Sequence, residues 1–125
     1  WENTALSVDI DIDDTVTSRI VFEHGGTYQV DFSCELLSSS GSSKTIYIWP
    51  RVNGTDISNS TIVTSIKNSG DRLVTSRSGI FEVDDGDYLE AMFAVTNTGL
   101  RIDGSAATAF SPSSPSATIV LTEIR

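Results

Sequence analysis

Three aspartates near the start of the chain recur at every second residue. Asp9, Asp11 and Asp13 alternate with apolar residues, so an extended strand would stack three carboxylates on one face. Such a row could bind calcium, which prefers several oxygen ligands. It could also lie beside the same row of other copies near a symmetry axis. A solvated outer face that discourages edge-to-edge aggregation explains the same pattern, and we prefer it. We therefore expect no cofactor, with calcium at these aspartates as the weaker alternative.

Few residues are suited to catalysis. His24 is the only histidine, and it lies beside Gly25 and Gly26 in a predicted turn. A Ser-His-Asp hydrolase would have to recruit this side chain from a loop, and no nucleophile-elbow spacing accompanies it. Acidic residues are numerous, but number alone does not place two of them at the separation that glycoside cleavage needs. We predict that the chain is not an enzyme.

Aromatic residues offer a different chemistry, because aromatic faces stack on sugar rings. Tyr47, Trp49 and Tyr88 could form such a platform. Packing inside a core or between subunits explains the same residues, and we prefer packing.

Strands must position these residues, because polar turns separate many short β-like runs and no helical period lasts three turns. Alternation over residues 26–36 predicts a half-buried strand, with Tyr28, Val30, Phe32, Cys34 and Leu36 on one face. Further strands are predicted at residues 6–12, 16–23, 45–53, 57–66, 73–83, 88–96, 100–110 and 117–124. We expect a break at Ser78-Gly79, and Pro50 marks a bulge or the end of regular pairing. The pattern predicts an all-β, two-sheet antiparallel sandwich of jelly-roll type with about ten strands.

Two predicted strands are apolar on both faces, at residues 46–49 and 88–95. Each sheet of a sandwich needs only one apolar face, so a second one implies a cover. Loops or ordinary surface apolarity are alternatives, but we favour another copy of the chain. The side chains that we expect at this subunit interface are Tyr47, Trp49, Tyr88, Met92 and Phe93.

Composition limits the partners and the architecture. Seventeen acidic residues against eight basic ones give a net charge of -9, which disfavours nucleic acids and anionic membranes as partners.

Cys34 is the only cysteine and falls in an alternating run, so we predict a small buried hydrophobe. The 125 residues suit a single domain. Because no signal peptide or starting Met is present, we expect the C-terminal head of a longer or processed chain.

Several segments together resemble a known family. The order Gly26-Thr27-Tyr28-x-Val30-x-Phe32, Ile46-x-Ile48-x-x-Arg51-Val52-Asn53-Gly54, Gly86-Asp87-Tyr88-Leu89, then Phe110 and a final strand, is similar to the complement one-q globular head and tumour-necrosis-factor superfamily. A Ser114-Pro115-Ser116 segment before the last strand resembles its phage and bacterial members. The resemblance implies a ten-strand jelly roll in a tight trimer, with aromatic residues of the inner strands about the three-fold axis. The first 20 residues and Pro50 depart from the vertebrate heads, whose ligands are therefore not carried over.

The resemblance implies a homotrimeric structural module on the virion surface of a bacteriophage, where it attaches to a host-surface glycan or protein. Exposed loops would make that contact, because loops on a rigid sandwich vary without disturbing the core. The loop residues that we expect to contact the host are Ser39, Ser40, Ser42, Asp56, Asn59 and Asn97. One alternative is a capsid decoration or stalk-capping protein that binds its capsid or stalk protein and no receptor. Another is a carbohydrate-binding module of a secreted or cell-surface bacterial protein, which predicts a monomer.

Overall fold

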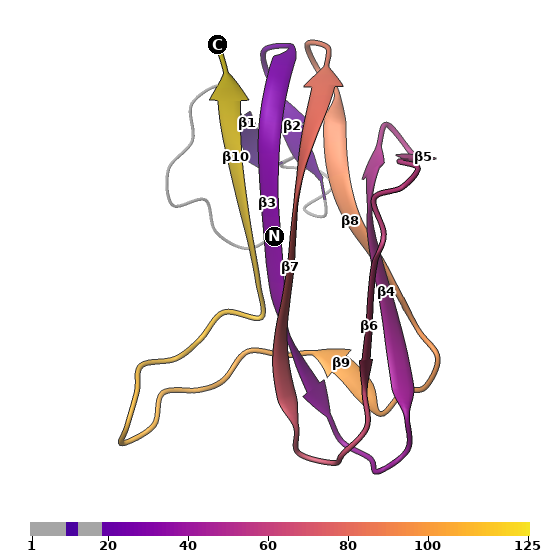
Figure 1. The fold of residues 1–125 in the computed structure, drawn as a ribbon. Helices are drawn as coiled ribbons and strands as arrows, with labels where there is room; N and C mark the ends of the chain where they lie inside the picture. The colour runs from indigo at the N-terminus through magenta and orange to yellow at the C-terminus, as the bar shows by residue number, and fades with distance from the viewer. Residues whose placement is uncertain (1–9, 13–18) are drawn as a thin grey trace.

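The computed structural model describes residues 10–12 and 19–125, and these residues form ten β-strands in two antiparallel sheets (Figure 1). Sheet A has the order β1 (Ile10–Ile12), β2 (Ile20–Phe22), β8 (Tyr88–Val95) and β4 (Lys44–Val52), and both β5 (Thr55–Asp56) and β6 (Ile62–Ile66) pair with β4. Sheet B has the order β10 (Ala117–Ile124), β3 (Gly26–Ser38) and β7 (Arg72–Val83), with β9 (Leu100–Ile102) also paired to β3. Within the described residues, no helix is available to cross a membrane.

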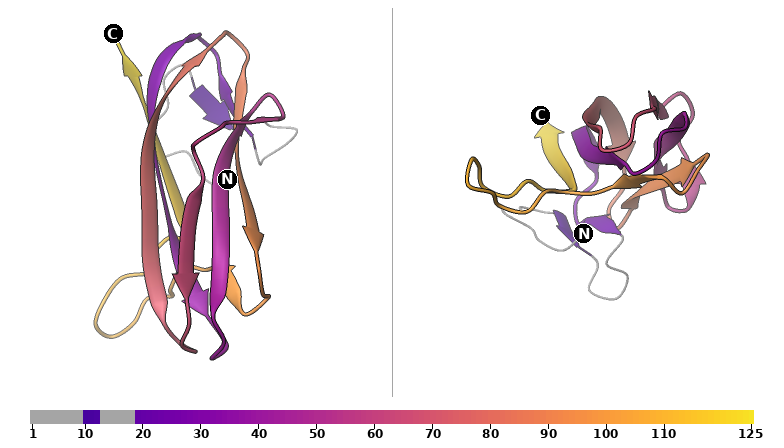
Figure 2. Two further views of the ribbon diagram at one scale, coloured as in Figure 1. Left: turned by 45° about the vertical axis from the view of Figure 1, so that its right-hand side comes forward. Right: turned by 90° about the horizontal axis from the view of Figure 1, so that it is seen from below.

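The chain moves between the two sheets as it proceeds. After β2 in sheet A come β3 in sheet B, β4 to β6 in sheet A, β7 in sheet B, β8 in sheet A, and β9 and β10 in sheet B. The two turned views show the resulting layers (Figure 2). The all-β, two-sheet antiparallel sandwich that the sequence predicts is therefore confirmed, and its strand order is consistent with a jelly roll.

The alternating strand predicted at residues 26–36 is the centre of sheet B. It extends two residues further, to Ser38, and pairs with β7 from Gly26 to Leu37 and with β10 from Thr27 to Cys34. Tyr28, Cys34 and Leu36 are at most 2% exposed, while Phe32 on the same face is only partly buried. Apolar side chains at every second position therefore bind this strand to the core, as period-two patterning requires.

Three predicted strand boundaries are wrong. The strand expected at residues 57–66 begins only at Ile62, because Asn59 adopts a left-handed φ of 58° in a turn and β4–β6 pairing stops at Ile48 and Ile62. The strand expected at residues 100–110 ends at Ile102. The strand expected at residues 16–23 covers only Ile20–Phe22 among the residues described there, which begin at residue 19.

Of the two predicted interruptions, the one in β7 is absent, and the one at Pro50 is present only on the side of β4 that faces β5 and β6. β7 continues through Ser78 and Gly79 without a break, because β3 pairs with every residue from Arg72 to Val83. Pro50 stays in register with Ala91 on β8, and its carbonyl accepts a hydrogen bond from the Ile57 N–H on the other side. That side is where pairing with β6 has already ended, so the missing N–H of Pro50 costs no ladder bond with β8.

Cys34 is buried, as its place in the alternating run predicts. Burial raises the pKa of this thiol to about 11, because the apolar core disfavours the thiolate. The native thiol is therefore a packing group at neutral pH.

Candidate functional site

The outer face of sheet A carries an aromatic and apolar surface. Cross-strand partners share a face of a sheet, and Tyr47 pairs with both Val63 on β6 and Ala94 on β8, while Trp49 pairs with Met92. The Val63 side chain is 60% exposed and that of Tyr47 is 39% exposed, whereas Trp49 and Met92 are half-buried. The structure thus places Tyr47, Trp49 and Met92 together, as the interface prediction supposed.

Polar contacts fix Trp49 in this surface. Its indole N–H donates a hydrogen bond of 2.8 Å to Oδ1 of Asp56, which also accepts one of 2.9 Å from Nε of Arg51. The indole of Trp49 and the guanidinium of Arg51 hold the pKa of the Asp56 carboxyl below its usual range. The short hairpin through β5 therefore keeps one aromatic ring and one ion pair in a set orientation beside exposed apolar side chains.

Tyr88 lies on the same face, but its ring has a cover. The guanidinium of Arg19 lies 4.1 Å from the centre of the Tyr88 ring, and Arg19 Nε is 3.9 Å from a carboxylate oxygen of Glu90. The first contact is a cation–π interaction and the second is a weak ion pair near the surface. Because one face of the ring is occupied, Tyr88 is less suited to stacking on a sugar than Tyr47.

Phe93 does not belong to this surface. It pairs with Ile48, whose side chain is in the core, so the Phe93 side chain is on the inward side of β8. It is nevertheless 59% exposed. The interface candidates therefore divide between two faces of sheet A, with Phe93 apart from the other four.

The predicted contact loops gather at one end of the sandwich and near β5. Backbone bonds join the loop after β3 to neighbouring turns: Ser39 N–H donates to Gly99 O at 2.8 Å and Gly70 N–H donates to Ser38 O at 2.6 Å. Asn97 lies in the same group, where its Oδ1 accepts a bond of 2.8 Å from Gly99 N–H. The structure thus brings the candidates Ser39, Ser40, Ser42 and Asn97 together, and it places Asp56 and Asn59 toward the other end, around β5 (Figure 1).

A buried lysine, which was not among the residues predicted from the sequence, holds that end together. Lys44 is 1% exposed, and its Nζ donates to the carbonyl oxygens of Ser40 at 2.6 Å, Lys67 at 3.1 Å and Ser42, and to Ser40 Oγ at 3.2 Å. The three N–H donors of the ammonium group share these four acceptors, which compensates for the loss of water around it. A signal was present: Lys44 has the same strand parity as Ile46 and Ile48, so it had to point inward.

A cavity of about 300 Å³ between the two sheets is a second feature that sequence patterning did not predict. Its inner wall is apolar, and polar residues line it along β7 and the loop that precedes β6. Gly79 on β7 lines it opposite Val30, and the Phe81 ring lies against the position that a Cβ atom of Gly79 would take. The residues of the inner wall are Val30, Phe32, Ile48, Ile62, Phe81, Leu89, Ala91 and Ile119, and the polar ones include Ser58, Asn59, Ser60, Arg77 and Ser78.

The predicted ion and catalytic residues are placed as follows. Asp9 and Asp13 lie outside the described residues, and Asp11 is in β1, where only the backbone is described. His24 is in the turn between β2 and β3, as expected, and its carbonyl accepts a bond of 2.8 Å from the Tyr28 hydroxyl. Across residues 10–12 and 19–125, no three His, Cys, Asp or Glu side chains come together as a metal site.

Comparison with known proteins gives this surface no assigned role. No family model matches the chain, and no curated protein matches its sequence.

Proposed function

We propose that this chain is a non-enzymatic, homotrimeric module on the surface of a virion of bacteriophage type, where it attaches the particle to its host. The observation that supports this best is the outer face of sheet A. Val63, Tyr47 and Ala94 lie side by side there and remain exposed, although a sandwich needs only its inward faces to form a core. A neighbouring copy of the chain would cover these side chains.

Host attachment belongs to the loops at the Lys44 end. Lys44 fixes the backbone of Ser40 and Ser42, while the Ser39, Ser42 and Asn97 side chains remain exposed. A loop that is already ordered loses little conformational entropy on binding, which favours recognition of a glycan or a protein surface. The virion setting rests on the resemblance of the Ser114-Pro115-Ser116 segment and the preceding motifs to phage members of the superfamily.

The solution mass tests the trimer. Light scattering after size exclusion should give about three times 13.4 kDa, or about 40 kDa. A monomer would contradict the trimer. It would favour the carbohydrate-binding module, because the exposed Tyr47 and the half-buried Trp49 would then face solvent beside the hydrogen-bonding groups of Arg51 and Asp56.

Binding to bacterial cells tests attachment separately from assembly. Ser39→Arg should reduce binding to host cells at least about tenfold while the mass stays unchanged, because it adds bulk to the loop without touching the Lys44 contacts. Thr118→Arg, on the exposed outer face of sheet B, is the matched control and should bind like the parent. Binding to purified capsids or stalks but to no cell would instead support the decoration or stalk-capping role.

A further inference from the structure

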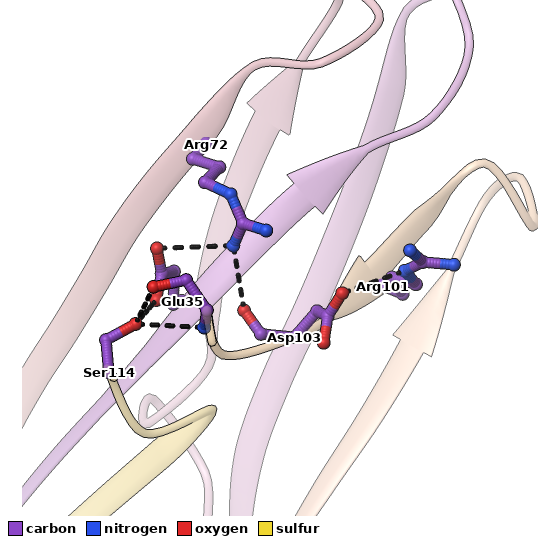
Figure 3. A network of polar contacts seen from close by, with 6 residues as sticks. Glu35, Arg72, Arg101, Asp103 and Ser114 are labelled. Atoms are coloured by element: carbon purple, nitrogen blue, oxygen red, sulfur yellow. Dashed lines mark hydrogen bonds and ion pairs between the residues drawn. The ribbon is translucent and has the colours of Figure 1, made fainter. Parts of the chain in front are cut away.

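The segment between β9 and β10 projects from the sandwich as an arm, which we define as residues 103–116 (Figures 1 and 2). Its base is bound to β3 through Glu35. The Glu35 carboxylate accepts a hydrogen bond of 2.6 Å from Ser114 Oγ and one of 3.4 Å from Nη1 of Arg72, which also donates to the Asp103 carbonyl at 3.3 Å (Figure 3). Both ends of the arm are thereby attached to the Glu35 carboxylate, Ser114 directly and Asp103 through Arg72.

Backbone contacts complete the base of the arm. Asp103 N–H donates to Glu35 O at 3.0 Å, and Ser105 and Ser114 form an antiparallel bridge with a Ser114 N–H to Ser105 O bond of 2.9 Å. A Cβ atom at Gly104 would overlap the carbonyl oxygen of Ser114, so the two strands of the arm approach as closely as glycine allows. The arm therefore leaves the sandwich in a defined direction.

The tip of the arm presents a phenylalanine to solvent. Phe110 is 100% exposed. The turn that carries it is ordered by Thr108, whose Oγ1 accepts bonds from the N–H groups of Phe110 at 3.1 Å and Ser111 at 3.2 Å. A single exposed apolar residue is ordinary on a protein surface. A large ring at the end of an ordered, anchored projection is a different case, because the base and the turn both limit where the ring can lie.

Charge distinguishes this part of the chain from the rest. Residues 104–122 contain no charged side chain, although one residue in five of the whole chain is charged. Two copies that each carry a net charge of -9 repel one another, so contact is least opposed where neither sign is present. The arm beyond Asp103 is thus a part of this acidic protein that a second copy can approach with little charge repulsion.

The same chain contains a cavity whose size and chemistry suit an aromatic ring. The cavity between the sheets has a volume of about 300 Å³ and an apolar wall, and apolar cavities of about 150 Å³ are enough to bind benzene. Its polar lining residues Ser58, Asn59, Ser60, Arg77 and Ser78 come from β7 and the loop before β6. The arm, by contrast, joins the β10 side of sheet B, which is the opposite edge from β7 (Figures 1 and 2).

We propose that Phe110 of each copy inserts into the inter-sheet cavity of the next copy, so that the arm links the subunits of the assembly. This inference rests on the proposed homotrimer and specifies one of its contacts. Because arm and cavity lie on different edges of the sandwich, the contact is heterologous, and it closes into a ring when the rotation between copies is one third of a turn.

The mass of arm and cavity variants tests the contact. Phe110→Ala should turn the trimer into monomer and raise the dissociation constant by a factor on the order of 10–100, as loss of a central aromatic anchor does. Val74→Ala, which shortens an apolar side chain that is 66% exposed on β7, is the matched control and should stay trimeric. Circular dichroism and the melting temperature measured at monomer concentrations should not change, because Phe110 makes no contribution to the core of its own subunit.

A variant at the cavity tests the other half of the contact. Ser58→Trp should block entry to the cavity and also give monomer, whereas Thr55→Trp, on exposed β5 outside the cavity lining, should not. A trimer with Phe110→Ala would overturn the role of the arm. A monomer with Phe110→Ala but a trimer with Ser58→Trp would overturn the role of the cavity and place the ring elsewhere on the neighbour.

Mixing the two variants distinguishes this contact from a symmetric one. Phe110→Ala keeps its cavity and Ser58→Trp keeps its arm, so one good contact is possible between them and no ring can close. The mixture should therefore give a mass near twice 13.4 kDa, about 27 kDa. If the parent protein itself is a monomer, the trimer and this contact both fail. A parent trimer whose mass neither variant changes overturns the contact alone.

Discussion

The loop at residues 38–43 and the arm at residues 103–116 are both rich in serine, yet the first folds back on the sandwich and the second projects from it. In the loop, one buried cation, Lys44, binds the carbonyl oxygens of Ser40 and Ser42 from below. In the arm, the anion of Glu35 binds only the base, through Ser114. The comparison shows that the shape of each serine-rich segment depends on the charged side chain that it contacts on a neighbouring strand.

The two anchors also differ in burial, and this difference sets the size of the effects expected from changing them. Lys44 is almost fully buried, whereas the Glu35 and Arg72 side chains are 16% and 38% exposed. Removing a buried charge leaves its hydrogen-bond partners unpaired. In a partly hydrated ion pair, water readily takes the place of the partner that is removed. We therefore expect loss of the Lys44 contacts to lower the stability of the whole domain, and loss of the Glu35 contacts to lower only the local stability of the arm.

Lys44→Met gives the largest expected effect. It leaves the carbonyl groups of Ser40, Ser42 and Lys67 without their donor in a water-poor site, which should lower the free energy of unfolding by about 2–4 kcal/mol. Urea unfolding followed by circular dichroism measures this loss. Lys67→Met makes the same substitution at an exposed side chain and should stay within about 0.5 kcal/mol of the parent. Equal stabilities for the two variants would contradict the role given to Lys44.

Glu35→Ala should have a smaller, local effect. The arm loses its bonds to Ser114 and Arg72, and global stability should fall by no more than about 1 kcal/mol because the pair is partly hydrated. The amides of Ser105 and Ser114, which bridge the base of the arm, should exchange with deuterium at least about fivefold faster. Glu82→Ala, at an exposed carboxylate on β7, is the control. Unchanged exchange in Glu35→Ala would mean that the backbone bridge alone holds the arm.

Thiol labelling of Cys34 compares how readily the sandwich opens in the two variants. Burial raises the pKa of Cys34 to about 11, so at pH 8 the reagent reacts only when the sandwich opens. The Lys44→Met variant should label on the order of 30-fold faster or more, and Glu35→Ala less than about fivefold faster. The folded chain keeps this proton at a pH where the unfolded chain releases it, so stability falls as pH rises from about 9 toward 11. Labelling should accelerate over that range in the parent too, and similar rates for both variants would show that the two segments open together.

Much of the fold follows from patterns that are local in the sequence. The alternation in β3 and the last strand, Ala117–Ile124, were predictable because side chains in a strand repeat every two residues and the turns between them have their own residue types. The Asn53-Gly54 turn after β4 is a case: both residues have positive φ, 49° and 79°, as the tight hairpin into β5 requires. The site was predictable only in part, since Tyr47, Trp49 and Met92 share a face by parity while Phe93 falls on the other.

By itself, the sequence determined that this protein is an acidic all-β sandwich with a buried thiol and more apolar strand surface than one core requires. Only the tertiary structure decided which partner each strand has, and hence that residues 103–110 leave the sheet, that Lys44 reaches three carbonyl groups from two loops, and that a cavity remains opposite Gly79. The physical reason is that periodicity orients a side chain relative to its own strand. Contacts between residues far apart in the chain then determine what that side chain meets.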